Sequence, residues 1–208
     1  QEELEYCLKQ NCSNPSVEKV ILFLDHEHVK YPNHEKIEVY VNDEDQLTYE
    51  KAFLYAKKFY ENQLCVLTNN DVFLDHESFS DTKEIENLCN YNVVLSLSRH
   101  EYNVHTQIGE MDSSFRGMLY AHTQDTWIWK ADFVPEDCNF NLGTLGCDNA
   151  INDRIHRSGK VPLNLGTKYK VYHVDHVRGK KGTNKFTRDE SSGRIKGNDE
   201  FHNFERET

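Results

Sequence analysis

The segment LCVLTNNDVFLD, residues 64–75, contains the pattern on which the predicted fold depends. An apolar run ends in the polar group Thr68-Asn69-Asn70-Asp71, and a second apolar run follows at once. Short apolar runs bounded by turn residues are typical of buried strands. The segment therefore predicts a strand that delivers the Asp71 carboxylate to its carboxyl end, where it could bind a hard cation. Asp75 is interpreted as a turn carboxylate.

Helical and strand patterns alternate on both sides of this segment. Helices are expected over 2–10, 48–61, 84–89 and 147–158, and further strands over 17–24, 37–41, 93–97, 126–129, 161–165 and 169–174. Strands separated by helices predict an α/β domain with a mainly parallel central sheet flanked by helices. In such sheets ligands collect at the carboxyl ends of the strands.

The domain is expected to span residues 1–178. From Gly179 onward Gly, Lys, Thr, Asn, Ser and Glu dominate. Residues 179–208 are therefore interpreted as a polar tail, either surface coil, which its low apolar content favours, or a flexible flap.

Composition excludes several classes of protein. A formal net charge of -11 argues against a nucleic-acid-binding surface, because polyanions are bound by basic patches. No stretch approaches the roughly 20 apolar residues of a membrane span, and the acidic start is unlike a signal peptide. The six cysteines lack metal-site spacing and are expected to be buried hydrophobes in a reducing compartment, so a cytoplasmic location is predicted.

Two further segments place charged residues beside predicted strands. Arg99 follows the strand ending at Leu97 and could contact a phosphate, or could instead form a surface ion pair with Glu101. Asp125 precedes the strand that carries Trp127 and Trp129 on one face. That tryptophan pair could pack against a sugar ring or belong to the core, with neither interpretation favoured.

The remaining candidates lie late in the chain. In GTLGCDN, residues 143–149, two glycines precede Asp148 at the start of a predicted helix. Asp148 could cap that helix, which is the commoner role, or act as a general base. In YHVDHVR, residues 172–178, His173 and His176 are candidate metal ligands, and Arg178 could bind a diphosphate.

Taken in order, the motifs TNNDVFLD (68–75), LSRHE (97–101), TQDTWIW (123–129) and GTLGCDN (143–149) resemble those of a family of GT-A glycosyltransferases. This family occurs in bacteria and large DNA viruses, and the resemblance is closest to chlorovirus domains that decorate the capsid glycan. It covers residues 1–178 and implies a GT-A, Rossmann-like fold. One departure is that the family's first, nucleotide-cradling strand is not evident here, so contacts to the base cannot be assigned.

The resemblance also implies roles for residues. Asn69, Asn70 and Asp71 look like the family's Asp-x-Asp motif, so Asp71 would hold Mn²⁺ or Mg²⁺ against the diphosphate of a UDP-sugar. The metal sphere would be completed by His173 or His176, with Arg99 and Arg178 helping to bind the donor. Asp148 matches the position of the catalytic base in inverting members, and Asp125 is the second choice. The acceptor would be a glycan or glycoprotein, contacted through Trp127 and Asn149, in the host cytoplasm if the protein is viral.

Two other functions remain open on the sequence. His173-x-Asp175-His176 could be part of the dinuclear site of a metal-dependent phosphoester hydrolase. The tryptophans and the 11 tyrosines could instead belong to a non-catalytic sugar-binding module.

Overall fold

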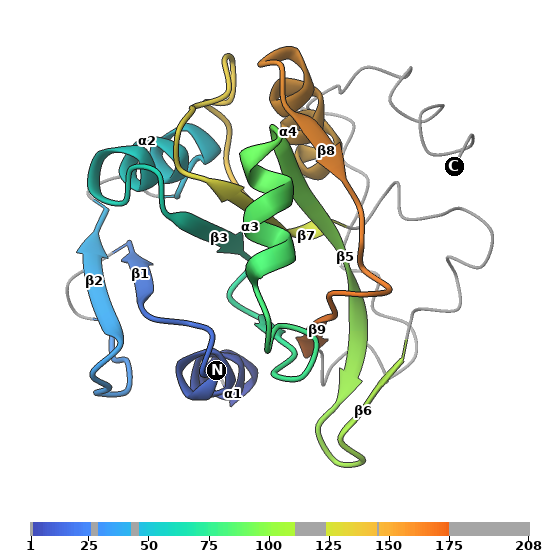
Figure 1. The fold of residues 1–208 in the computed structure, drawn as a ribbon. Helices are drawn as coiled ribbons and strands as arrows, with labels where there is room; N and C mark the ends of the chain where they lie inside the picture. The colour runs from blue at the N-terminus through green and yellow to red at the C-terminus, as the bar shows by residue number, and fades with distance from the viewer. Residues whose placement is uncertain (1, 26–28, 43–45, 111–123, 145, 175–208) are drawn as a thin grey trace.

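The computed structural model describes residues 2–25, 29–42, 46–110, 124–144 and 146–174. Its helices are α1 (Glu2–Ser13), α2 (Tyr49–Phe59), α3 (Lys83–Asn90) and α4 (Cys147–Arg157). Its strands are β1 (Val20–Leu24), β2 (Ile37–Val41), β3 (Leu64–Thr68), β4 (Val72–Leu74), β5 (Val93–Asn103), β6 (Ile108–Glu110), β7 (Gln124–Lys130), β8 (Val161–Leu163) and β9 (Val171–Val174). Figure 1 shows the long strand β5 running through the molecule, with α3 lying in front of the sheet. The predicted tail, 179–208, lies outside the described residues.

The central sheet is mixed and rich in antiparallel pairs, so the predicted mainly parallel, GT-A-like sheet is wrong. The sheet has the order β3-β7-β5-β9-β4, with β6 and β8 also paired to β5. Within the described residues, four of its pairings are antiparallel, and only β5–β8 and β5–β9 are parallel. The strands β1 and β2 form a separate parallel pair.

The error has a physical cause. Alternating helix and strand patterns predict parallel neighbours only when each helix links two strands that lie side by side. Here β3 and β5 are separated by β7, which comes from later in the chain and runs antiparallel to both. Hydrophobic periodicity reports which residues are buried but not the direction of the neighbouring strand, so it could not reveal this insertion.

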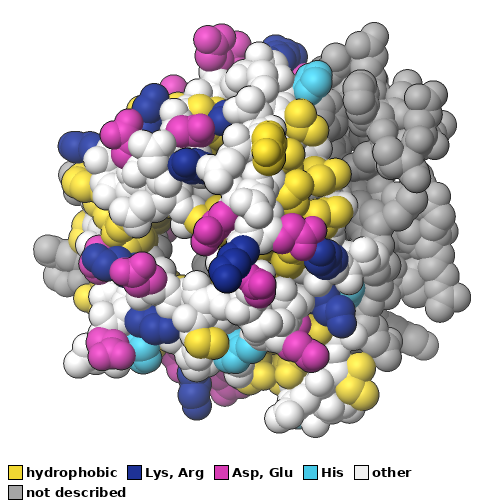
Figure 2. All heavy atoms as spheres, in the orientation of Figure 1, with side chains coloured by type: hydrophobic (Ala, Val, Ile, Leu, Met, Phe, Trp, Pro, Cys, Tyr) yellow, Lys and Arg dark blue, Asp and Glu magenta, His cyan; other side chains and the backbone are white. Residues whose placement is uncertain are grey.

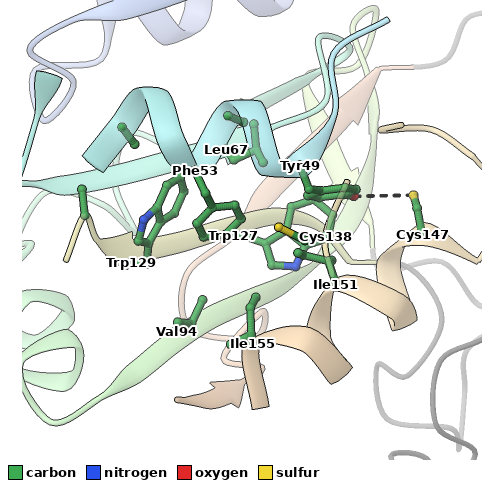
Figure 3. Packing of buried hydrophobic residues seen from close by; sticks show 13 residues of the cluster. Tyr49, Phe53, Leu67, Val94, Trp127, Trp129, Cys138, Cys147, Ile151 and Ile155 are labelled. Carbon is green, nitrogen blue, oxygen red and sulfur yellow. Dashed lines mark hydrogen bonds between the residues drawn. The ribbon is translucent and has the colours of Figure 1, made fainter. Parts of the chain in front are cut away.

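Helices cover both faces of the sheet, and the two largest of the three apolar clusters among the described residues lie on opposite faces. On one face α2 and α4 pack against Trp127 and Trp129 of β7, with Phe53 stacked on Trp129 at a centroid distance of 4.4 Å. Figure 3 shows Trp127 between these two helices and Trp129 beside Phe53 of α2. On the other face α3 packs through Ile85 against Leu95 and other strand residues. The predicted Thr48 cap of α2 is confirmed, because its Oγ1 accepts a 3.3 Å hydrogen bond from the Lys51 backbone N–H.

Some expectations from composition can be compared with the structure. The six cysteines are free thiols, five of them buried and Cys65 half-buried, as predicted. On the face drawn in Figure 2, basic side chains are interspersed with acidic ones and do not gather into a patch. Among the described helices, none has both the length and the hydropathy needed to cross a membrane.

The helix α1 is attached to the edge strand β4 by asparagine side chains. Asn11 Nδ2 donates to the Val72 carbonyl at 3.0 Å, and Asn11 Oδ1 accepts from the Leu74 backbone N–H at 3.0 Å. Asn14 Nδ2 donates to the Leu74 carbonyl at 3.3 Å. The Asn11 amide thus bonds to β4 as a neighbouring strand would, and holds α1 beside the segment that carries Asp71.

Replacing Asn11 with alanine should destabilise the protein by about 1–3 kcal/mol, because it leaves one donor and one acceptor of β4 without their partner. Chemical denaturation of wild type and Asn11→Ala measures the change. The matched control is Asn87→Ala, at an exposed position of α3, which should change the unfolding free energy by less than about 0.5 kcal/mol. Equal effects of the two substitutions would contradict the assigned role of Asn11.

Candidate active site

A network of charged side chains lies where β3, β5, β7 and β9 come together. The end of β3 is tied to the start of β7, since Thr68 pairs with Thr126 and Asn69 N–H donates to the Asp125 carbonyl at 3.2 Å. Asn69 Nδ2 also donates to Asp125 Oδ1 at 2.8 Å. The turn that follows β3 therefore places Asp71 and Asp125 in one region, although they are far apart in sequence.

A β-bulge in β7 brings Asp125 next to charged residues of β5. Leu97 pairs with Thr126 and Ser98 with Gln124, so the register shifts here and Asp125 is the extra residue of β7. Before the shift, Leu95 and Leu97 point into the core beneath α3. Alternation places Arg99 and Glu101 on the same face of β5, and Arg99 pairs with Val171 at the end of this core. Beyond it Arg99 contacts Asp125, the extra residue of the bulge, and Glu101 contacts His173.

Arg99 is the central cation of the network. Its Nη1 donates to Asp125 Oδ2 at 2.8 Å, and its Nε donates to Glu101 Oε1 at 3.0 Å. The side chains of Arg99 and Asp125 are only 14% and 6% exposed. Burial raises the pKa of Asp125, and the adjacent guanidinium opposes that shift. Burial also disfavours the charged guanidinium, but the carboxylates of Asp125 and Glu101 raise the pKa of Arg99 overall.

His173 joins this network to Asp71. Its Nδ1 lies 2.8 Å from Glu101 Oε2, and its Nε2 lies 3.2 Å from Asp71 Oδ2. Burial would lower the pKa of His173, but hydrogen bonds to the two carboxylates raise it to about 9. Burial would also raise the pKa of Asp71, whereas the hydrogen bond and charge of His173 hold it below the usual value.

The Asp71–His173 pair has the chemistry of a small cation site. Asp71 Oδ1 is buried and has no hydrogen-bond partner among the described residues. A histidine that ligates a metal through one nitrogen usually donates its other N–H to a carboxylate, as Glu101 permits at Nδ1. No group of three or more His, Cys, Asp or Glu side chains in the described part of the chain is arranged to hold a metal. The described protein ligands would therefore be Asp71 and His173, with other positions left to phosphate and water.

Asp148 lies in the first turn of α4, close enough to the network to sense its charges. The helix begins at Cys147 after Gly146, whose φ of 85° is the left-handed conformation that glycine favours. The residue at the N-cap is Gly146 and not Asp148, so the capping role is corrected. Burial raises the pKa of Asp148 to about 7, with a further contribution from the charge of Asp125. A carboxyl group with this pKa can accept a proton near neutral pH.

Other predicted site residues are placed differently. Trp127 is fully buried, and its Nε1 donates to Asn152 Oδ1 at 3.1 Å, so the predicted sugar contact is corrected to a core role. Asn70 is exposed in the turn before Asp71, and Asn149 is half-buried in the first turn of α4. Asp75 has the predicted turn role, since its Oδ2 accepts from the Ser78 N–H at 2.9 Å. His176 and Arg178 lie outside the described residues.

Glu101 is a site residue whose contact with His173 was not predicted from the sequence. The predicted strand ends at Leu97, and the only role expected for Glu101 is that of a surface partner of Arg99. In the structure β5 continues to Asn103, and Glu101 pairs directly with His173 across β5 and β9. The ion pair with Arg99 does form, but the second oxygen of the same carboxylate contacts His173. The alternation of Arg99 and Glu101 in a longer strand is the signal that could have revealed it.

Comparison with known proteins assigns no family. No protein-family model matches the sequence, and no curated protein matches it significantly. The chemistry of the site must therefore be inferred from its residues and their geometry.

Replacing Asp148 with asparagine should stabilise the protein above pH 7. The folded-state pKa of about 7 lies above the usual value of 3.8, so the folded state binds more protons between these values and loses stability as the pH rises. An asparagine side chain cannot ionise, so Asp148→Asn should raise the unfolding free energy by on the order of 2 kcal/mol at pH 8. Thermal unfolding of both proteins at pH 4 and pH 8 measures this. A stabilisation that is equal at both pH values would contradict the raised pKa.

Proposed function

We propose that the protein is a metal-dependent glycosyltransferase that moves a sugar from a nucleotide-diphosphate donor, UDP-sugar being the first choice, to a glycan hydroxyl. The observation that carries the proposal is the pairing of a two-residue cation site with a separate carboxyl group whose pKa is near neutrality. Displacement of a diphosphate by a hydroxyl needs both parts, one to neutralise the leaving group and one to accept a proton.

The donor would bind beside Asp71 and His173. Their oxygen and nitrogen atoms suit Mn²⁺, and a bound divalent cation would neutralise the negative charge that develops on the diphosphate as the glycosidic bond breaks. With His173 neutral, as a metal ligand must be, Arg99 is the cation among the described site residues, and it is outnumbered by four carboxyl groups, those of Asp71, Glu101, Asp125 and Asp148. Such an excess of negative charge disfavours a free diphosphate and favours one accompanied by a cation.

Asp148 would act as the general base. In its ionised form the carboxylate removes the proton of an acceptor hydroxyl, and that oxygen attacks the anomeric carbon as the bond to the diphosphate breaks. Attack from the face opposite the leaving group gives inversion of configuration. The raised pKa matches the task, because proton transfer is most effective when the base titrates near the working pH.

Arg99 and Glu101 support these groups. The ion pair with Arg99 holds Asp125 in place, and the charge of Asp125 acts on Asp71 and His173 as well as on Asp148. Since both Nε and Nη1 of Arg99 are bonded to carboxylates, support of the network accounts for its position better than the predicted phosphate contact does. Glu101 fixes the ring of His173 by its contact with Nδ1.

UDP together with Mn²⁺ should raise the melting temperature of the protein, because a ligand bound only to the folded state stabilises it. Neither EDTA-treated protein with UDP nor Asp71→Ala with both ligands should show this shift. The matched control is Asp75→Ala, which removes a carboxylate of the same segment that caps a turn and should retain the UDP–Mn²⁺ shift. The same measurement with GDP in place of UDP tests which nucleotide base the site prefers. No metal-dependent shift with either nucleotide would contradict the proposal, and phosphoester hydrolysis without an acceptor would favour the hydrolase.

Transfer activity should rise with pH through about 7 as Asp148 ionises. Asp148→Asn should lower kcat by about 100- to 10,000-fold, the usual contribution of a general base, while leaving the UDP–Mn²⁺ shift intact. Sugar transfer from UDP-glucose to glycan acceptors, followed from pH ~5.5 to ~9, measures both effects. If Asp148→Asn kept full activity, Asp148 would not be the base, and Asp125→Asn would be the next variant to assay.

A further inference from the structure

A hydroxyl, a thiol and a carboxylate form a continuous hydrogen-bonded chain at the start of α4. The Tyr49 hydroxyl donates to Cys147 Sγ at 3.5 Å, and Cys147 Sγ donates to Asp148 Oδ1 at 3.2 Å. Tyr49 and Cys147 are 1% and 2% exposed, and they belong to the core between α2 and α4. Figure 3 shows the Tyr49 hydroxyl directed at the sulfur atom of Cys147.

The direction of these bonds is set by chemistry. Burial raises the pKa of Cys147 to about 12, so its sulfur keeps the proton and can donate it. Asp148 can only accept when it is ionised. A donor to a carboxylate favours the ionised form, whereas burial and nearby negative charge favour the neutral form.

The other groups that act on Asp148 come from three neighbouring elements. Asp125 of β7 opposes ionisation of Asp148, and Arg99 of β5 favours it. Tyr49 of α2 interacts with Asp148 and bonds to the thiol. Within α4 itself, the Cys147 thiol and the backbone N–H of Asp148 favour ionisation. Cys147 is thus the side chain of the described site that donates a hydrogen bond directly to this carboxylate.

We propose that Cys147 is a positioning residue for the catalytic base, with its S–H, held by the Tyr49 hydroxyl, orienting the Asp148 carboxylate and stabilising its ionised form. The inference rests on the proposed role of Asp148 as the base. The thiol forms and breaks no covalent bond in this role. The proton of the acceptor hydroxyl moves to Asp148, and the proton of Cys147 stays on sulfur.

The test follows the titration of Asp148 without any substrate. The NMR chemical shift of the Asp148 carboxyl carbon, identified as the signal that is lost in Asp148→Asn, changes as this group ionises, so its midpoint reports the pKa of Asp148 in the folded protein. In Cys147→Ala the midpoint should move upward by about half to one pH unit relative to wild type. Cys147→Ser, which keeps a donor at this position, should return it toward the wild-type value.

The matched control is Cys138→Ala. Cys138 is equally buried in the same core, but its Sγ donates to the Pro135 carbonyl at 3.0 Å and not to a carboxylate. This variant should lose stability without moving the midpoint. Tyr49→Phe removes the hydroxyl that holds the thiol and should move the midpoint upward by less than Cys147→Ala does. It also decides the question if Cys147→Ala does not fold.

The outcomes separate this inference from the proposed function. An unchanged midpoint in Cys147→Ala, or in Tyr49→Phe if the former does not fold, would overturn the positioning role. An upward shift that serine reverses would support it, whether or not transferase activity is found. Where activity is measurable, the alkaline shift should recur in the pH profile of kcat. Full activity of Asp148→Asn would overturn the role of the base and leave the titration result standing as a structural one.

Discussion

The buried ion pair between Arg99 and Asp125 is the interaction on which the rest of the site depends. A carboxylate that is 6% exposed cannot stay ionised without a close cation, and Arg99 supplies one at 2.8 Å. The same guanidinium bonds to Glu101, and Glu101 bonds to His173, which contacts Asp71. One cation therefore links β5, β7 and β9 and fixes the positions of three carboxylates. Removing it would leave buried negative charge unpaired, which is costly both for stability and for the geometry of the site.

The contact between Asp125 and Arg99 lies at an irregularity in the sheet. Opposite Leu97 and Ser98, β7 carries one extra residue, Asp125, and its carboxylate bonds to Arg99 of β5. The strand β5 then continues to Asn103 and pairs with β6 and β9. The two halves of β5 thus serve different purposes. The first half builds the core with α3, and the second half carries Arg99 and Glu101 into the site.

The site also separates two kinds of acidic group by environment. Asp71 is held below its usual pKa by His173 and suits binding of a cation, whereas the pKa of Asp148 is raised to about 7 and suits transfer of a proton. In Asp125 the two influences oppose each other, because burial raises its pKa and the charge of Arg99 lowers it. Two carboxyl groups whose environments shift their pKa values in opposite directions can perform different tasks in one reaction. The opposite pKa shifts of Asp71 and Asp148 are the physical basis of the proposed transferase mechanism.

The sequence by itself determined the local features of this protein. Its periodicity located nearly all the described helices and strands. Residue type predicted the Thr48 cap, the turn role of Asp75 and the burial of the cysteines. The helices, the cap and the turn depend on neighbours within a few residues. The sequence also singled out Asp71, Arg99, Asp125 and His173, which the fold then brings together. Only the tertiary structure decided the antiparallel insertion of β7, the burial of Trp127 and the bridging role of Glu101. Each of these depends on which distant segment lies alongside, and strand direction and pairing partner leave no mark in the period of a single strand.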